Sequence, residues 1–226
     1  MSTEALPKEG IIKVDGGRGF VVQGDRECRY VVTAAHCLQR AGEPYIPPAI
    51  GGISYTHERT YERLLGPIGG EQTVSAECLF VDPIADLAVL GTPDEQELYE
   101  ESEEYAALTG AASLPVAEVP LIREQITSVS PFDGHAFTFL GAPKGECPAW
   151  LLSLDGHWFR CDVIAHPCAL AIANAAEAIA SGMSGSPIVT EDGSAIGIVC
   201  NSSGPHPNLA ANLPPWLLRS IGLLGG

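Results

Sequence analysis

The sequence predicts an all-β protein, and two of its features support that prediction. Gly and Pro are frequent, with 25 and 18 copies in 226 residues, which indicates many turns between short elements. Runs of β-branched and aromatic residues recur between clusters of turn residues, at the spacing expected of a sandwich or a barrel. A chain of this length forms either one large domain or two small ones, and it can bury a sizeable core.

The first part of the chain contains a series of these short β-type runs. They span residues 10–14, 19–22, 30–33, 78–81 and 86–90. Turn residues lie between successive runs, Gly24-Asp25 after the second and Asp82-Pro83 after the fourth. We therefore expect a hairpin from the second and third runs, and a small β-domain over residues 1–91.

Residues 92–105 differ in composition from the rest, because they carry many acidic side chains and no basic one. The acidic residues are Asp94, Glu95, Glu97, Glu100, Glu101, Glu103 and Glu104. A charge run is usually a solvated face, so we interpret residues 92–108 as an interdomain linker that is helical in part. The alternative is a docking site for a basic regulatory partner.

The β pattern resumes in the second half, residues 109–226. We expect a strand over 136–140, a hairpin from 150–154 and 157–164 around Asp155-Gly156, and a second hairpin from 186–190 and 195–199. The chain closes with an amphipathic segment over 213–224, which is opened by Pro214-Pro215. We expect it to form a short helix that packs through Trp216, Leu217 and Ile221.

Composition and charge exclude several classes of protein. Hydrophobic residues make up 46% and charged residues 18%, as in a folded globular protein. The net charge of −16 argues against nucleic acid and anionic membranes as partners. The N-terminus has no basic and apolar signal pattern, and no apolar run reaches about 18 residues. We therefore expect a cytoplasmic protein without membrane segments.

The seven cysteines are odd in number and irregular in spacing. They are Cys28, Cys37, Cys78, Cys147, Cys161, Cys168 and Cys200. Without a secretion signal, we interpret them as mostly reduced core residues. A zinc site from Cys147, Cys161, His166 and Cys168 is the alternative, but no Cys-x-x-Cys pair supports it. We expect no metal and no cofactor.

Three local patterns carry chemistry, and each is weak alone. In the first, residues 30–37, an apolar strand delivers small residues and then His36. In the second, residues 82–90, Asp86 stands at the head of an apolar run, where a carboxylate needs a partner. Each could equally be structural, His36 as an ordinary core histidine and Asp86 as a strand cap.

The third pattern is a glycine-rich turn over residues 181–189. Ser184 lies between glycines in a turn that leads into a strand. Such a turn can present a hydroxyl as nucleophile and direct the N–H groups of Gly182 and Ser184 at one point, as in an oxyanion hole. The order His, Asp, Ser is that of one of the known Ser-His-Asp arrangements.

These three patterns together resemble the trypsin-like serine peptidases, over about residues 10–204. Thr33–Cys37 matches the histidine box of that family, Asp86–Leu90 its aspartate box, and Gly182–Pro187 its serine box with two substitutions. The resemblance implies two six-stranded antiparallel β-barrels with a catalytic triad of His36, Asp86 and Ser184 between them. It implies a serine endopeptidase that works through an acyl-enzyme. Asp82 is the competing acid, but it precedes a proline in a turn.

Departures from the family pattern are informative. Met183 replaces the acid that pairs with a new N-terminus in zymogen-activated members, so we expect no activation by N-terminal cleavage. Ser186 replaces a glycine, as is often found in compact bacterial members. The partner of Cys37 in secreted relatives has no counterpart on residues 20–22, so we expect a free thiol.

Specificity is less well defined by the resemblance. It implies Ala178 at the base of the first specificity pocket, and Cys200, Asn201 and Ser202 in the strand that pairs with substrate. Because the base of this pocket is uncharged, the pocket favours a small or apolar substrate residue over Lys or Arg. A shift of the alignment by one or two residues would bring in Glu177 instead.

Two other functions are compatible with the same patterns. The first is a catalytically silent or partner-activated member that serves as a binding module. The second is ester hydrolysis by the same triad, since the acyl-transfer chemistry is common to both.

Overall fold

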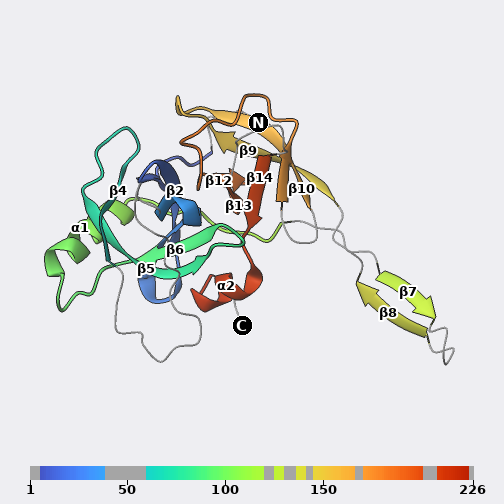
Figure 1. Ribbon diagram of the computed structural model, residues 1–226, viewed down its shortest axis with the longest axis horizontal. Helices are drawn as coiled ribbons and strands as arrows, with labels where there is room; N and C mark the ends of the chain where they lie inside the picture. Colours follow the sequence, from blue (N-terminus) through green and yellow to red (C-terminus); the bar gives the residue numbers. More distant parts are fainter. Residues whose placement is uncertain are drawn as a thin grey trace.

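Two closed six-stranded antiparallel barrels form the body of the protein, which confirms the predicted fold class (Figure 1). The computed structural model describes residues 6–38, 60–119, 125–129, 136–140, 145–165, 170–200 and 208–223. No helix within these stretches is both long and apolar enough to cross a bilayer.

The first barrel has the strand order β1-β2-β3-β6-β5-β4. Its strands are β1 (Ile11–Val14), β2 (Gly17–Gln23), β3 (Arg29–Thr33), β4 (Thr60–Pro67), β5 (Val74–Asp82) and β6 (Leu87–Gly91). All were predicted except β4, in which Glu62 and Arg63 interrupt the apolar pattern and the pairing with β5 shifts register. Arg63 has a φ of 50°, so the strand is irregular at this point.

The second barrel has the strand order β10-β11-β14-β13-β12-β9. Its strands are β9 (Glu146–Leu152), β10 (Trp158–Ala165), β11 (Leu170–Ala173), β12 (Pro187–Val189), β13 (Ala195–Val199) and β14 (Asn208–Asn212). The two predicted hairpins are confirmed as β9–β10 and β12–β13. β11 and β14 were not predicted, because they are short and rich in Ala and Asn, which are weak strand formers.

The predicted strand over 136–140 is confirmed as β8 (Ala136–Leu140), but it belongs to neither barrel. It pairs with β7 (Gln125–Val129) in a separate two-stranded sheet. Figure 1 shows this hairpin standing apart from the two barrels.

The acidic segment contains helix α1 (Tyr99–Thr109), which packs against the first barrel. Ser102, Tyr105 and Thr109 are its buried residues. The Tyr105 hydroxyl donates to the carbonyl oxygens of Arg29 at 3.1 Å and Leu90 at 3.3 Å. The acidic side chains are thus carried by a helix that is anchored to β3 and β6 through Tyr105.

The predicted C-terminal helix is α2 (Pro215–Ser220), which is shorter than the predicted 213–224. Leu217 and Leu218 are its buried residues, and Ile221 packs against the core. Trp216, expected to be packed, is half exposed and makes an edge-to-face contact with Phe80, with ring centroids 5.3 Å apart.

The two barrels share a continuous core. One cluster of buried apolar side chains extends from Phe20 and Leu90 in the first barrel to Val189, Ile198 and Cys200 in the second. Because this cluster crosses the boundary, it fixes the barrels against each other and brings the ends of their strands together.

Candidate active site

His36 lies on a short 3-10 helix, Ala35–Leu38, which directly follows β3. Ala34 and Ala35 are buried, so the small residues allow the chain to turn closely at the end of the strand. The imidazole is 43% exposed, so it can be reached from solvent.

Asp86 holds His36 at two points. Its Oδ2 is 2.8 Å from His36 Nδ1, and its Oδ1 accepts the backbone N–H of His36 at 2.9 Å. Its own carbonyl accepts the N–H of Ala35 at 3.2 Å. The sequence predicted that Asp86 opens the strand, but in the structure it lies immediately before β6. Its φ is 55°. This left-handed backbone is rare for residues other than glycine and is held here by the three contacts.

The contact with Asp86 changes the charge of the site. The hydrogen bond that His36 donates to the Asp86 carboxylate, with a smaller contribution from Cys37, raises the pKa of His36 to about 10 against the opposing effect of burial. In the resting site at neutral pH, His36 is therefore an imidazolium paired with a carboxylate.

Ser184 lies in the turn that leads into β12. Gly182 and Gly185 have φ values of 96° and 78°, which favour glycine. A Cβ on Gly185 would lie 1.9 Å from the carbonyl oxygen of Arg18, so this position also has no room for a side chain. The glycines of the serine box thus bring the Ser184 turn into close contact with β2.

The Ser184 hydroxyl has a partner in the second barrel. Its Oγ donates to the carbonyl of Cys200 at 3.1 Å. Among the described residues, the backbone N–H groups of Gly182 and Ser184 have no acceptor. Met183 is buried, and its sulfur accepts the N–H of Ala180 at 3.4 Å. This contact stabilises the turn from its buried side.

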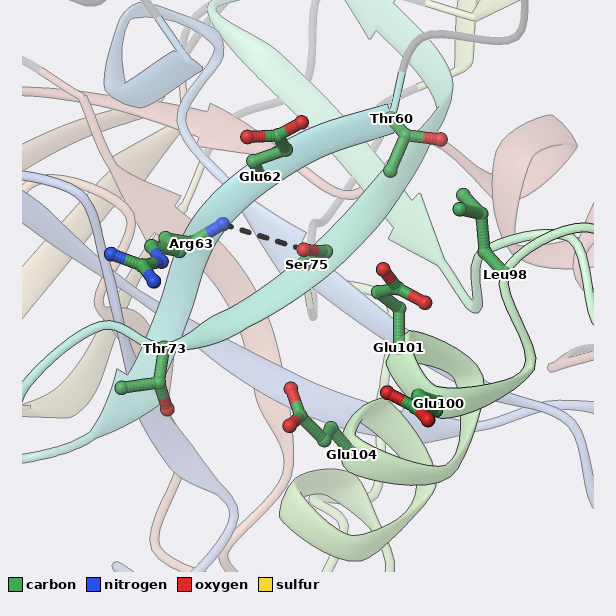
Figure 2. Close-up of a pocket in the computed structure, with 9 residues that line it drawn as sticks. All are labelled: Thr60, Glu62, Arg63, Thr73, Ser75, Leu98, Glu100, Glu101 and Glu104. Atoms are coloured by element: carbon green, nitrogen blue, oxygen red, sulfur yellow. Dashed lines mark hydrogen bonds between the residues drawn. The ribbon is translucent and has the colours of Figure 1, made fainter.

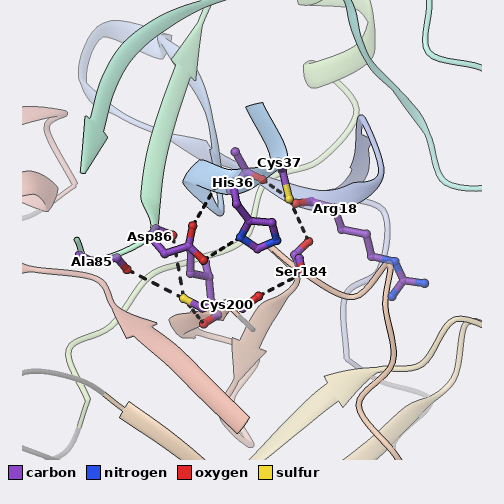
Figure 3. A network of polar contacts seen from close by, with 9 residues as sticks. Arg18, His36, Cys37, Ala85, Asp86, Ser184 and Cys200 are labelled. Carbon is purple, nitrogen blue, oxygen red and sulfur yellow. Dashed lines mark hydrogen bonds and ion pairs between the residues drawn. The ribbon is translucent and has the colours of Figure 1, made fainter. Parts of the chain in front are cut away.

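The three predicted triad residues come together where the barrels meet. Figure 3 shows the His36 ring between the Asp86 carboxylate and Ser184. Further contacts join the same groups, because the Sγ of Cys37 is 3.7 Å from the Ser184 carbonyl oxygen and that of Cys200 is 3.9 Å from the Asp86 carbonyl oxygen. Two separate barrels thus bring His36, Asp86 and Ser184 into one cluster.

Comparison with protein families agrees with this arrangement. The family model for the trypsin-like peptidase domain matches residues 17–198. The chain belongs to the trypsin-like peptidase family. None of the curated proteins searched is significantly similar to it in sequence.

Three solved structures of similar fold are distant from this peptidase domain in sequence. An inactive form of Rv3671c from M. tuberculosis is 14% identical, with a TM-score of 0.46 over 94% of this chain and 84% of that one. The MamO protease domain from Magnetospirillum magneticum is 15% identical, with a TM-score of 0.44 over 94% and 95%. The HtrA-type protease AlgW is 16% identical, with a TM-score of 0.48 over 91% of this chain and 50% of that one.

The predicted specificity residues of the peptidase domain are only partly brought together. Cys200 directly follows β13, is buried, and accepts the Ser184 hydroxyl through its carbonyl. Ala178 is exposed, and Asn201 and Ser202 lie outside the described residues. Glu177, the alternative to Ala178, is 2.6 Å from the Nε2 of His157 through its Oε1.

The described part of the peptidase domain contains no group of three His, Cys, Asp or Glu side chains placed to bind a metal. Of the alternative zinc ligands, His166 and Cys168 lie outside the described residues. Cys147 and Cys161 lie on β9 and β10, and burial raises the pKa of both thiols, that of Cys161 to about 12. Both are therefore neutral thiols at physiological pH.

A polar hollow of about 420 Å³ lies between α1, β4 and β5, and none of its lining residues belongs to the triad (Figure 2). Its wall includes four acidic residues, namely Glu62, Glu100, Glu101 and Glu104. The idea that the acidic segment docks a basic partner stays a prediction, and this hollow is the surface on which it can be tested.

Sequence reasoning did not single out Arg18, whose backbone N–H donates to the Ser184 carbonyl at 2.7 Å. A signal was present, because Arg18 is a charged residue between two glycines at the start of an apolar run. A cation in such a strand needs buried acceptors, and these are provided by the second barrel.

Proposed function

We propose that this chain is a serine endopeptidase that hydrolyses peptide bonds through Ser184, His36 and Asp86. The observation that carries the proposal is the two-point contact between Asp86 and His36, with Ser184 on the far side of the same imidazole (Figure 3). A carboxylate that fixes both the ring and the backbone of a histidine beside a serine is the arrangement that activates a hydroxyl nucleophile.

In the first half of the reaction, His36 acts as general base. With Nδ1–H donating to Asp86, the neutral tautomer leaves Nε2 free to accept the Ser184 proton. The hydroxyl must first leave the Cys200 carbonyl, and its oxygen then attacks the substrate carbonyl carbon. The N–H groups of Gly182 and Ser184, which have no acceptor among the described residues, can donate to the resulting oxyanion.

The first half ends when His36 gives its proton to the leaving amine, so the C–N bond breaks and an acyl-enzyme remains on Ser184. In the second half, water attacks the ester carbon while His36 accepts a proton from it. His36 then returns this proton to Ser184 Oγ as the C–O bond of the ester breaks, and the acid product leaves. Asp86 stays ionised throughout and stabilises the imidazolium in each tetrahedral step.

The test is digestion of a mixed peptide library, with cleavage sites read by mass spectrometry. We expect internal cleavage by the wild type and none by Ser184→Ala. Hydrolysis of activated esters without any peptide cleavage would favour the esterase alternative. A folded wild type that cleaves neither would favour a silent or partner-activated binding module.

A further inference from the structure

Arg18 is a buried cation on β2 at the contact between the two barrels. Its exposed fraction is 4%, although arginine is rarely buried so fully. The flanking residues are glycines, and Phe20, Val21 and Val22 continue the strand into the core. The guanidinium therefore lies where an apolar side chain would be expected.

The guanidinium reaches across to the second barrel. Its Nη1 donates to the carbonyl of Leu152 at 2.7 Å, and its Nη2 donates to that of Ser153 at 2.9 Å. Within the described residues it forms no ion pair with a carboxylate, and burial lowers its pKa. Because a buried charge held only by carbonyls is costly, an apolar residue of similar size would be expected if stability were its only role. The planar fork is specific for two neighbouring carbonyls, so it fixes geometry.

The backbone of Arg18 contacts both halves of the catalytic site. Its N–H donates to the carbonyl of Ser184 at 2.7 Å. Its carbonyl accepts the hydroxyl of Thr33 at 2.7 Å, and Thr33 ends the strand that leads to His36. Figure 3 shows the side chain of Arg18 extending away from the triad while its backbone stays beside Ser184.

The turn that Arg18 holds also touches the oxyanion segment. Leu154 follows Ser153, and its Cδ2 lies 3.5 Å from the point that a Cβ on Gly182 would occupy. Holding the carbonyls of Leu152 and Ser153 therefore holds the backbone next to Leu154, whose half-exposed side chain lies beside Gly182.

We propose that Arg18 is a positioning residue that sets the Ser184 turn of the second barrel in register with His36 of the first. This inference rests on the proposed function, because the register matters through the reaction of Ser184 with substrate. A misplacement of about 1 Å between reacting groups costs roughly 10²-fold in rate. Arg18 touches neither the hydroxyl nor the imidazole in the contacts described, so it acts only through the relative position of these two groups. A change in that position affects the chemical step more than substrate binding.

The test compares Arg18→Met, which keeps the length and removes the fork, with Arg18→Lys, which keeps the charge. Arg160→Met is the matched control, because Arg160 on β10 has a side chain that is 67% exposed. Each protein is checked for a cooperative thermal transition. Peptide turnover gives kcat and KM, and amide hydrogen exchange reports on the peptide that covers residues 181–186.

We expect kcat of Arg18→Met to fall at least tenfold with KM changed less than threefold, and exchange in residues 181–186 to become faster. Arg18→Lys should lie between Arg18→Met and the wild type, and Arg160→Met should match the wild type in both measurements. Unchanged exchange in that segment of Arg18→Met would overturn the inference, whether or not its melting temperature falls.

Two further outcomes are decided by the same data. If Arg18→Met does not fold, Arg18→Lys decides, and an unchanged kcat with unchanged exchange in Arg18→Lys would overturn the inference. If the wild type itself cleaves no peptide, the proposed function fails, and the exchange comparison alone decides whether Arg18 holds the Ser184 turn.

Discussion

Asp86 and His36 are joined by two hydrogen bonds that restrain different parts of the histidine. One, at 2.8 Å, fixes the ring through Nδ1, and the other, at 2.9 Å, fixes the backbone N–H. A single carboxylate thus sets both the tautomer of the imidazole and the position of the segment that carries it.

Asp86→Asn should reduce kcat by about 10³- to 10⁴-fold, with little change in KM. The amide cannot stabilise an imidazolium, and its NH₂ group favours the wrong tautomer of His36. Asp82→Asn is the matched control, because Asp82 Oδ1 accepts the N–H groups of Ile84 and Ala85 in a turn, and an amide oxygen can do the same. Steady-state kinetics on a cleaved peptide decide between them. A larger loss of kcat in Asp82→Asn than in Asp86→Asn would show that Asp82, not Asp86, is the acid of the triad.

The activity of the enzyme should increase with pH well above neutrality. A pKa of His36 near 10 means that the neutral imidazole needed to accept the Ser184 proton is scarce at pH 7. Below that pKa, kcat/KM should increase about tenfold per pH unit. A plateau that begins at neutral pH would contradict this account.

The same raised pKa also predicts the sign of a stability change. The unfolded histidine titrates near 6.5, so the charged pair stabilises the fold fully below that pH and loses its effect as pH rises towards 10. The free energy of unfolding of the wild type, minus that of His36→Ala, can be measured by urea denaturation. This difference should decrease as pH rises from about 6.5 towards 10. A difference that grows with pH would be the contrary result.

Ser186→Ala should leave the free energy of unfolding unchanged or raise it by about 1 kcal/mol. The Ser186 hydroxyl is fully buried and has no hydrogen-bond partner among the described residues, so its removal relieves an unpaired polar group. Thr33→Val is the contrasting variant, because the equally buried Thr33 hydroxyl donates to the Arg18 carbonyl. Its loss should cost about 1–3 kcal/mol. Equal effects in chemical denaturation would show that the Ser186 hydroxyl is in fact satisfied.

Gly185→Ala should destabilise the protein far more than Gly156→Ala. Both glycines have positive φ, so each substitution strains the backbone by about 1–2 kcal/mol. Within the described part of the chain, a Cβ at Gly156 meets nothing within 4 Å, whereas one at Gly185 would overlap the Arg18 carbonyl oxygen. We expect Gly185→Ala to lose at least 3 kcal/mol or fail to fold. Similar melting temperatures for the two variants would mean that the Ser184 turn is not packed against β2.

The sequence located the three residues of the candidate site better than the surroundings that hold them. His36, Asp86 and Ser184 were located because each follows or precedes an apolar strand in a short, specific pattern. β4 escaped notice because Glu62 and Arg63 break its alternation, and β11 and β14 because Ala and Asn give no strand signal. These strands are formed by pairing with neighbours, which local sequence does not record.

Apart from the contacts within the predicted triad, the long-range contacts described here could not be predicted from the chain. The Arg18 guanidinium donates to carbonyls that lie 134 and 135 positions further along the chain. The Ser184 hydroxyl donates to a carbonyl 16 positions further along. Helix α1 was foreseen as a solvated linker that is helical in part, but its packing on the first barrel was not, because its many glutamates hide the three buried residues that anchor it. The exposed position of Ala178 likewise depends on the path of the chain after β11.

The most direct test of the account is labelling with a fluorophosphonate, with the modified residue mapped by mass spectrometry. Such a probe reacts only with a serine that is activated as a nucleophile. The account predicts one adduct, on Ser184, that forms faster as pH rises and is absent from Ser184→Ala and strongly reduced in His36→Ala. A folded wild type that gives no adduct, or gives it on another serine, would contradict the claim that these three residues form a working triad.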